Sequence, residues 1–319
     1  MNNRIPLRKM LTVGLLPGCL KKALYRLQGN HIGKHVRLSL GSVVTCKNKF
    51  SIGDRSQIGY FTSISGHSVQ IGHDSKIRSA VIINADNIHI GNDVTISETA
   101  ILRAGHLSER SSLVIDDLVH IFPATTIDPS RLVHLKEECA VGPGCSIFTH
   151  GSYKDALNGY PVNYGDVIIG ERVELTYNVF VAPGVTIGND TVVGYGSYVN
   201  HDLPANVLAA GLPAVIKRRK EQFAPSPSEE EKKKILEDIL SEFKNHLSYK
   251  NIPFSEEQIS LAGTDEIIVN GTSRFNLQTR RCVPSDDLLV STLRRFLSRY
   301  GIRFKTIDET PIFSRPEKQ

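Results

Sequence analysis

The chain has 319 residues, of which 40% are hydrophobic, and it contains no tryptophan. This length allows one extended domain and a small second one with a sizeable apolar core. Residues 1–53 hold ten Lys or Arg and no acid, whereas the other 266 residues hold 28 basic and 33 acidic side chains. The basic excess is therefore local to the N-terminus, and the chain as a whole lacks the basic stripe of a nucleic-acid-binding protein.

Cysteine usage and hydropathy indicate the cellular compartment of the protein. The cysteines show no metal-type or redox-type spacing, so we expect reduced thiols in a cytoplasmic protein. No apolar run approaches the roughly 20 residues that span a bilayer, and the run at 11–20 is interrupted by Pro17. The five cysteines are Cys19, Cys46, Cys139, Cys145 and Cys282.

The first predicted element is a short amphipathic helix at residues 18–28. Leu20, Leu24 and Leu27 share one helical face, and basic side chains occupy the others. Such a helix either makes a weak peripheral contact with an anionic membrane through residues 1–28, or it covers the open end of a solenoid. The sequence leaves both interpretations open.

Aliphatic residues then recur every six positions through most of the chain. A period of six is not helical, but it fits short strands with a turn in each unit, three units making one coil of 18 residues. Each aliphatic side chain is expected to point inward and stack on its counterpart one coil below. The glycine that often follows it is expected to turn the corner at positive φ. The clearest run is Ile169, Leu175, Val181, Ile187, Val193 and Val199, and further triplets begin at Ile52, Ile71, Ile90, Ile115 and Leu135.

This strict phase predicts a parallel β-helix, because the variable loops of a β-sandwich would destroy it. Two segments break the phase, residues 103–114 and 148–166. Each is predicted to leave one corner of the coil as a loop, and long loops on a rigid scaffold usually carry function. His150 stands at the start of the second loop. Its position alone favours the interpretation as an exposed loop histidine.

After the repeat the pattern becomes that of a small α+β domain. An amphipathic helix is expected to begin at a capping box formed by Ser228 and Glu231. Further predicted elements are strands at 266–270 and 273–283 joined by a tight turn at Asn270 and Gly271, a helix from Ser285 to Tyr300 and a final strand near 303–307. The predicted organisation is a basic N-terminal segment (1–31), a β-helix (32–216), a linker (217–228) and the α+β domain (229–319), whose role in acceptor binding, carrier docking or subunit support is open.

The stretch from Phe148 to Lys217 resembles the hexapeptide-repeat acyltransferases, especially the sugar and polysaccharide O-acetyltransferases. The resemblance implies that the β-helix is left-handed, against the usual crossover rule, that the working unit is a homotrimer, and that acetyl-CoA or another acyl-CoA lies between neighbouring prisms. Many members carry Trp-Ile-Gly where this chain has Glu174, Leu175 and Thr176, which leaves the acceptor open. The matching motifs are FTHGSY (148–153), VIIG (167–170), NVFVAPGVTIGNDTVVGYGSYV (178–199) and NHDLPANVLAAGLPAVIK (200–217), in which His201 replaces a common Lys.

Transfer of an acyl group from a thioester to a hydroxyl needs a base, an oxyanion donor and a groove for the CoA arm. The Thr-His match implies that His150 is the general base, with an orienting partner left open among Asp155, Asp166 and Glu174. Acyl-CoA is a co-substrate here and not a permanently bound cofactor. Its candidate contacts are small corner residues and cations for its phosphates, each of which has a purely structural alternative: Ala182, Gly184, Gly196, Ser197, Lys217 and Arg218.

The leading interpretation is an O-acyltransferase acting on a sugar or surface-polysaccharide precursor by direct transfer. N-acylation of an amino sugar is a close variant. Cys145 as an acyl carrier is a weaker alternative, because its repeat position suits a small packed residue. A γ-type carbonic anhydrase would need three histidines converging on zinc, and no metal is predicted because no compelling ligand spacing occurs among His89, His106, His120 and His134.

Overall fold

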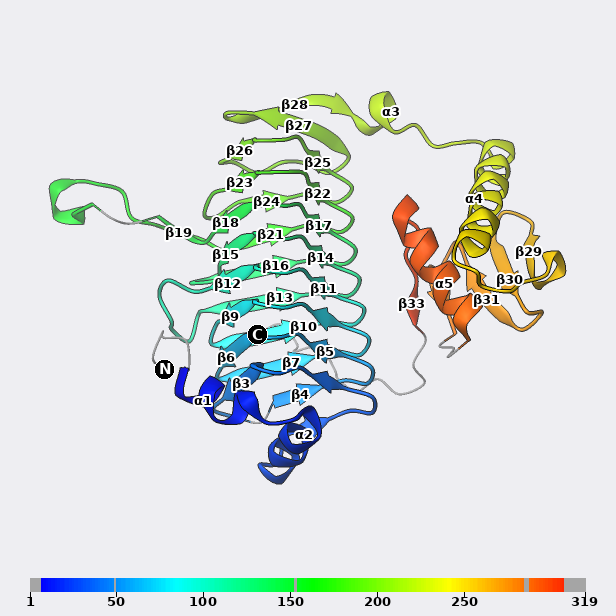
Figure 1. Ribbon diagram of the computed structural model, residues 1–319. Coiled ribbons are helices and arrows are strands. Elements are labelled where there is room, and N and C mark those ends of the chain that lie inside the picture. The colour runs from blue at the N-terminus through cyan, green and yellow to red at the C-terminus, as the bar shows by residue number, and fades with distance from the viewer. Residues whose placement is uncertain (1–6, 49, 152–153, 284–286, 307–319) are drawn as a thin grey trace. The chain divides into compact units, whose positions relative to one another are not determined.

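The computed structural model describes residues 7–48, 50–151, 154–283 and 287–306. The chain divides into two compact units, Met1–Phe223 and Ala224–Gln319. Figure 1 shows the first unit as a stack of short parallel strands with a hairpin leaving one side. Among the described residues, no helix combines the length and the apolar character needed to cross a bilayer.

The first unit is a parallel β-helix whose strands line up in sheets that we name A, B and C. Sheet A holds β1 (His31–Ile32), β4 (Phe50–Ile52), β7 (Ser68–Ile71), β10 (Asn87–Ile90), β13 (Ser112–Ile115), β16 (Leu132–Leu135), β21 (Val167–Ile169) and β24 (Thr186–Ile187). Sheet B holds β2 (Arg37–Leu38), β5 (Gln57–Ile58), β8 (Lys76–Ile77), β11 (Thr95–Ile96), β14 (His120–Ile121), β17 (Ala140–Val141), β22 (Glu174–Leu175), β25 (Val192–Val193), β27 (Val207–Gly211) and β28 (Ala214–Arg219). Sheet C holds β3 (Val43–Cys46), β6 (Ser63–Gly66), β9 (Ile82–Asn84), β12 (Ile101–Arg103), β15 (Thr126–Asp128), β18 (Ser146–Phe148), β23 (Phe180–Val181) and β26 (Tyr198–Val199).

The aliphatic residues of the repeat form the core of this unit. Ile52, Ile71 and Ile90 are partners in the registers of β4, β7 and β10, and each is at most 1% exposed. Burying one such side chain contributes about 1.5–3 kcal/mol before the loss of chain entropy is counted. The predicted parallel β-helix is confirmed, and its left-handed sense stays an implication of the resemblance.

Two corners of each coil have a fixed length, and the third does not. From sheet A to sheet B and from B to C, successive inward residues lie six apart, as in Ile90, Ile96 and Leu102. From sheet C to the next strand of sheet A the step varies from six residues up to the 22 that separate Ile147 from Ile169. Insertions into the repeat therefore collect at this C-to-A corner, which we call the variable corner.

The glycine after the inward aliphatic residue has a different role from the predicted one. Gly170 and Gly188 do not adopt positive φ; that conformation falls two residues later, at Arg172 (φ 54°) and Asp190 (φ 55°). A Cβ on Gly188 would lie 2.3 Å from the backbone nitrogen of Ala205. The prediction of corner-turning glycines was wrong, because these glycines are required by the close approach of successive coils.

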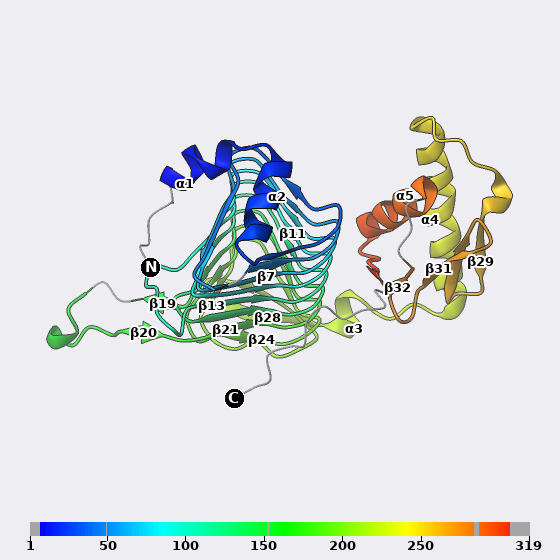
Figure 2. The same cartoon turned by 90° about the horizontal axis from the view of Figure 1, so that it is seen from below.

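The N-terminal elements α1 (Leu7–Leu11), η1 (Val13–Leu15) and α2 (Gly18–Leu27) precede the stack. Figure 2 shows α2 lying across the first coil. Its Lys21 and Tyr25 are buried, and Lys21 Nζ donates to the carbonyl oxygens of Ser39 (2.6 Å) and Ser42 (3.1 Å). These contacts supply donors to carbonyls at the exposed edge of the first coil. Of the two interpretations of this helix, the end cap is thus observed.

The other end of the unit closes with an antiparallel pair. Strand β28 pairs with β27, and helix α3 (Lys220–Phe223) follows directly. The linker predicted to begin at residue 217 therefore begins inside a strand. Ordered structure continues because sheet B extends beyond the hexapeptide repeat.

The second unit packs two helices against an antiparallel sheet with one parallel edge. The capping box of Ser228 and Glu231 is confirmed, as is the tight turn, in which Asn270 and Gly271 both have positive φ. The predicted strand 273–283 is broken into two, and the predicted helix start at Ser285 lies outside the described residues. The elements are α4 (Glu229–Tyr249), η3 (Glu256–Gln258), β29 (Ile259–Ala262), β30 (Glu266–Val269), β31 (Ser273–Asn276), β32 (Arg281–Cys282), α5 (Leu288–Leu297), η4 (Ser298–Tyr300) and β33 (Lys305–Thr306).

Candidate functional site

Three successive coils bring their variable corners together. The loop after β12, the short turn after β15 and the long excursion after β18 follow one another along the stack, because β12, β15 and β18 are neighbours in sheet C. The long excursion begins and ends as an antiparallel hairpin of β19 (His150–Gly151) and β20 (Asn163–Tyr164), with η2 (Ala156–Asn158) between them. This hairpin is the arm that projects from the stack in Figure 1.

His150 meets an acidic residue from the coil below. Its Nδ1 lies 3.3 Å from Oδ2 of Asp128, and the two side chains are 20% and 8% exposed. Within the described residues Nδ1 makes no hydrogen bond, so the two groups lie close together without being aligned as a hydrogen bond. Catalytic hydrogen bonds in unliganded enzymes are often long and tighten when substrate binds.

The Asp128 carboxylate is itself held in place by backbone donors. Oδ1 accepts the N–H of Ser130 at 2.9 Å, and Oδ2 accepts the N–H of Gly105 at 2.9 Å. The carboxylate therefore ties the lower loop to the middle turn and presents a fixed oxygen to His150. A Cβ on Gly105 would lie 2.9 Å from that oxygen and 3.0 Å from Cε1 of His150, so this position must be glycine to admit the imidazole.

Aromatic and basic side chains surround the imidazole. The ring of His106 meets that of His150 edge-on, with centroids 5.1 Å apart, and the ring of Tyr164 stacks near it at 5.9 Å. The guanidinium of Arg131 lies 4.6 Å from the centroid of Tyr164. The imidazole of His150 is thus bordered by groups that can contact a polar, ring-shaped molecule.

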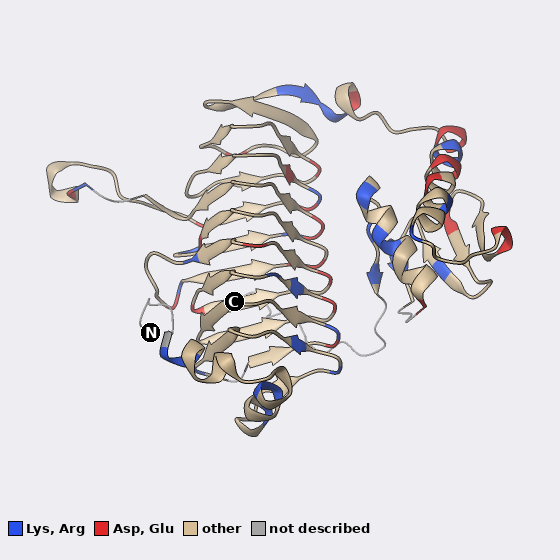
Figure 3. Ribbon diagram, viewed as in Figure 1, with Lys and Arg blue, Asp and Glu red and all other residues tan. Residues whose placement is uncertain are grey.

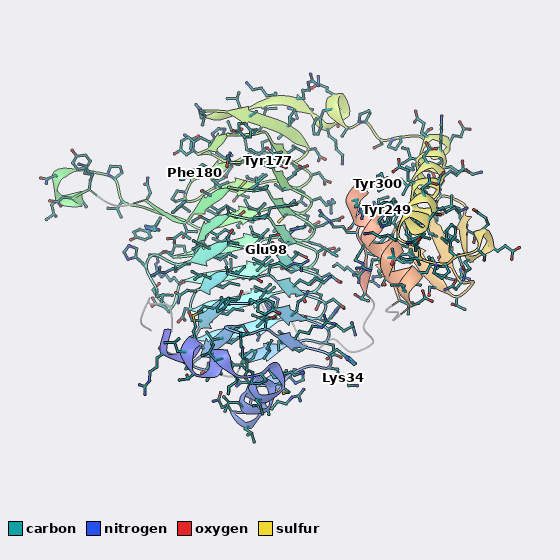
Figure 4. All side chains as sticks on the ribbon, viewed as in Figure 1. Lys34, Glu98, Tyr177, Phe180, Tyr249 and Tyr300 are labelled. Atoms are coloured by element: carbon teal, nitrogen blue, oxygen red, sulfur yellow. The ribbon has the colours of Figure 1, made fainter. Side chains whose placement is uncertain are left out.

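An aromatic column continues from the site along sheet C. Phe148 stacks on Phe180 at 5.5 Å, and Phe180 contacts Tyr198 at 5.6 Å. Phe180 and Tyr198 are 38% and 36% exposed, and Phe180 projects outward in Figure 4. Exposed apolar surface of this kind often marks a contact with a ligand or a partner.

The residues predicted to contact acyl-CoA occupy separate parts of the prism. Ala182 and Gly184 lie on the variable corner one coil beyond His150, and a Cβ on Gly165 at the hairpin base would come within 2.5 Å of Gly184 Cα. Gly196 and Ser197 lie on the B-to-C corner, where the buried Ser197 hydroxyl donates to the Gly194 carbonyl at 2.6 Å. Lys217 and Arg218 are exposed on β28. Within one chain these six positions do not converge, and each stays a prediction.

The acid that lies beside His150 was not among those singled out from the sequence. Asp155 caps η2, Asp166 accepts the backbone N–H of Leu132, and Glu174 is exposed on sheet B. Asp128 was missed because it precedes the histidine by 22 residues. A signal existed, since Asp128 follows the inward Ile127 directly and Ile127 pairs with Ile147 just before the histidine.

The histidines considered for a metal site lie apart within the described part of one chain. His120 stacks on Phe122 over sheet B, whereas His89 and His134 lie on strands of sheet A and His106 lies at the variable corner. Among the described residues no group of three potential ligands could hold a metal. Cys145 is fully buried, and burial raises the pKa of its thiol to about 11.

No protein-family model matches the chain. Part of it is 49% identical over 70 residues to the putative colanic acid biosynthesis acetyltransferase WcaF of Escherichia coli (strain K12), covering 22% of this chain and 38% of that protein. It is 46% identical over 73 residues to galactoside O-acetyltransferase of the same organism, covering 20% and 36%. It is 32% identical over 111 residues to the putative lipopolysaccharide biosynthesis O-acetyl transferase WbbJ, also of that strain, covering 32% and 55%. Over these segments the chain resembles O-acetyltransferases.

The chain spans between about a third and about a half of the length of these curated relatives. Among solved structures, the UDP-N-acetylglucosamine acyltransferase from Campylobacter jejuni is 16% identical with a TM-score of 0.48, covering 72% of this chain and 88% of that one. The polySia specific acetyltransferase NeuO is 23% identical with a TM-score of 0.31, covering 60% and 75%.

Proposed function

We propose that this protein is an acyl-CoA-dependent O-acetyltransferase that modifies a sugar or a surface-polysaccharide precursor. The observation that carries the proposal is the pairing of His150 with the buried Asp128 on a corner that three coils build together. The similarity of part of the chain to O-acetyltransferases supports the proposal as well.

In the proposed reaction His150 acts as the general base. When the proton of the neutral imidazole is assigned to Nδ1, the nitrogen nearer Asp128, Nε2 is left with a lone pair. Nε2 takes the proton of the acceptor hydroxyl while the hydroxyl oxygen attacks the thioester carbonyl carbon. When the tetrahedral adduct collapses, its C–S bond breaks and the imidazolium returns the proton to the departing thiolate. Asp128 acts as a positioning residue, because its negative charge favours the imidazolium that forms between the two proton transfers.

Direct transfer is preferred to a route through a covalent acyl-enzyme. The thiol of Cys145, with its pKa of about 11, stays protonated at neutral pH. It also donates to the carbonyl oxygen of Thr176 at 2.8 Å. A buried, protonated thiol is a poor nucleophile, so the acyl group is proposed to pass straight to the acceptor.

The co-substrate is proposed to lie between neighbouring prisms of a homotrimer. The exposed rings of Phe180 and Tyr198 would then form one wall of the groove that leads to His150. The basic pair Lys217 and Arg218 would contact phosphate groups of the CoA arm. Light scattering on the purified protein tests this arrangement, since a stable monomer with full activity is incompatible with it.

The decisive experiment compares single histidine replacements during steady-state turnover. Release of free CoA is followed with acetyl-CoA and a panel of sugars, and acetylated products are identified by mass spectrometry. His150→Ala is expected to lower kcat by about 10²–10⁴-fold, the usual contribution of a positioned base, while acetyl-CoA affinity changes little. His201→Ala is the matched control, because His201 is an exposed histidine farther along the same unit. Near-normal turnover of the His150 variant would refute the assignment, and acylation of amino groups alone would favour N-acylation instead.

A further inference from the structure

Helix α2 turns its apolar face away from the protein that it caps. Lys21 and Tyr25 face the stack and are buried. Leu20 and Leu27, two helical turns apart on another face, are 53% and 86% exposed, and Leu24 between them is half-buried. The helix is fixed by its polar side, and Leu20 and Leu27 are left mostly exposed on the other face.

Exposed leucines continue into the preceding elements. Leu11 at the end of α1 and Leu15 at the end of η1 are 69% and 52% exposed. Large exposed apolar side chains on three short elements that follow one another in the chain are more than the scattered exposure expected of a protein surface. They indicate a partner that accepts apolar side chains at this end of the stack.

The charge of the same region restricts what that partner can be. No acidic residue occurs before Asp54, and Arg8 and Lys9 are exposed on α1. Figure 3 shows basic residues on α1 and α2. A second copy of this surface would bring two acid-free basic regions face to face, which is unfavourable. An anionic bilayer offers negative headgroups for the cations and an acyl region for the leucines.

We propose that α1, η1 and α2 form a docking surface for anionic lipid bilayers, with the leucine stripe of α2 inserted at the headgroup boundary. The contacts of the buried face explain how a helix of only ten residues is held in a binding conformation before it meets lipid. Lys22 Nζ donates to the Val36 carbonyl at 3.3 Å and an Arg26 guanidinium nitrogen to the Ile32 carbonyl at 2.8 Å. A preformed helix avoids the entropic cost of folding on the membrane.

The proposal is tested by vesicle sedimentation with the full chain. The vesicles are phosphatidylcholine alone or an equal mixture of phosphatidylcholine and phosphatidylglycerol. The wild type is expected to sediment with the mixed vesicles at low salt and less so as salt screens the charges. Leu20→Gln with Leu27→Gln is expected to lower the partition coefficient by about 10–100-fold, since each leucine is worth roughly a factor of ten. Thermal unfolding is expected to be unchanged, because neither side chain contacts the core.

Two controls separate the contributions of apolar and charged groups. Leu157→Gln with Leu212→Gln removes leucines that are 96% and 76% exposed elsewhere in the unit and is expected to leave binding unchanged. Arg8→Gln with Lys9→Gln is expected to weaken binding about fivefold per charge and to reduce its salt dependence. Equal sedimentation of the wild type and the α2 variant overturns the proposal. So does equal binding to both vesicle types, or a change of oligomeric state without lipid in the α2 variant, which would identify the stripe as a contact between copies.

Discussion

Replacing Asp128 by Asn removes one charge and almost no volume at the centre of the site. The carboxylate accepts two backbone N–H groups, from Ser130 and Gly105, and faces Nδ1 of His150. An amide has only one acceptor oxygen, so its NH2 group must point either at the Ser130 N–H or at both the Gly105 N–H and Nδ1 of His150. In the second case Nδ1 becomes the acceptor, the proton moves to Nε2 and the base is lost, as occurs when a triad aspartate is replaced.

The expected loss follows from the separation of the two groups. Opposite unit charges 3.3 Å apart interact by about 5 kcal/mol at an effective dielectric constant of 20 and by about 1.3 kcal/mol in water. Since the pair is partly exposed, we take a value near 3 kcal/mol, which corresponds to roughly a 10²-fold fall in kcat. An amide that faces a buried backbone donor also costs about 1–3 kcal/mol of stability, so the melting temperature is expected to fall by several degrees.

The assay measures kcat, KM and acetyl-CoA affinity for the wild type, Asp128→Asn and a matched control, Asp166→Asn. Asp166 lies at the same corner and accepts the Leu132 N–H, so it undergoes the same chemical change without the proposed role. We expect kcat to fall in the first variant alone, with acetyl-CoA affinity near that of the wild type in both. A folded Asp128→Asn enzyme within threefold of wild-type kcat, or an equal loss in the control, would refute the positioning role.

Three further predictions test the scaffold and the site. Gly105→Ala should lower kcat by at least about tenfold, since its methyl group would press on His150, the proposed base, whereas Gly151→Ala, with open space around it, should be near-normal in the same assay. Burial alone would raise the pKa of Asp74, but hydrogen bonds from its histidine neighbour and from Arg55 hold that pKa well below its usual value. The contribution of ionised Asp74 to the stability is present above about pH 4 and is lost as pH falls. Arg55→Met should therefore lower the free energy of unfolding, measured by urea titration, by about 1 kcal/mol at pH 7. The same urea titrations should show a smaller loss at pH 3. Leu175→Ala should cost about 2–5 kcal/mol in the same titrations, because the side chain is fully buried and its removal leaves a cavity.

The core of the first unit could be predicted residue by residue. A six-residue period fixes which side chain points inward, and Ile169, Leu175 and Val181 are all buried as expected. The reason is local, because each unit repeats the same strand and turn. The period could not reveal why glycine is required after the inward aliphatic residue, because that requirement depends on the distance between coils and not on the turn itself.

The site was predicted only in part, because it too depends on how successive coils stack. His150 is recognisable from its motif and its place at a break in the phase. Asp128 becomes its neighbour only through the stacking of coils, so it could be found only by aligning successive coils along the chain. The orientation of α2 could not be predicted from the sequence either. Its apolar stripe would ordinarily be expected to face the protein, but the exposed carbonyls of the first coil bind the donors of its polar side, including Lys21.

Because two corners of each coil have a fixed length, the height of a loop along the stack follows from the number of coils below it. Strands of neighbouring coils lie about 4.8 Å apart, so an insertion of one whole coil lifts everything beyond it by that step without turning it. An insertion of a single six-residue unit would instead carry every later loop round to the next corner of the prism. His150 stands five steps, or roughly 24 Å, above the first coil, and a bilayer that touched the outer face of α2 would lie farther below the imidazole by about the 10 Å width of that helix. A lipid-anchored acceptor would have to reach across that gap, and the number of coils between cap and site sets the height at which a hydroxyl group can be acylated.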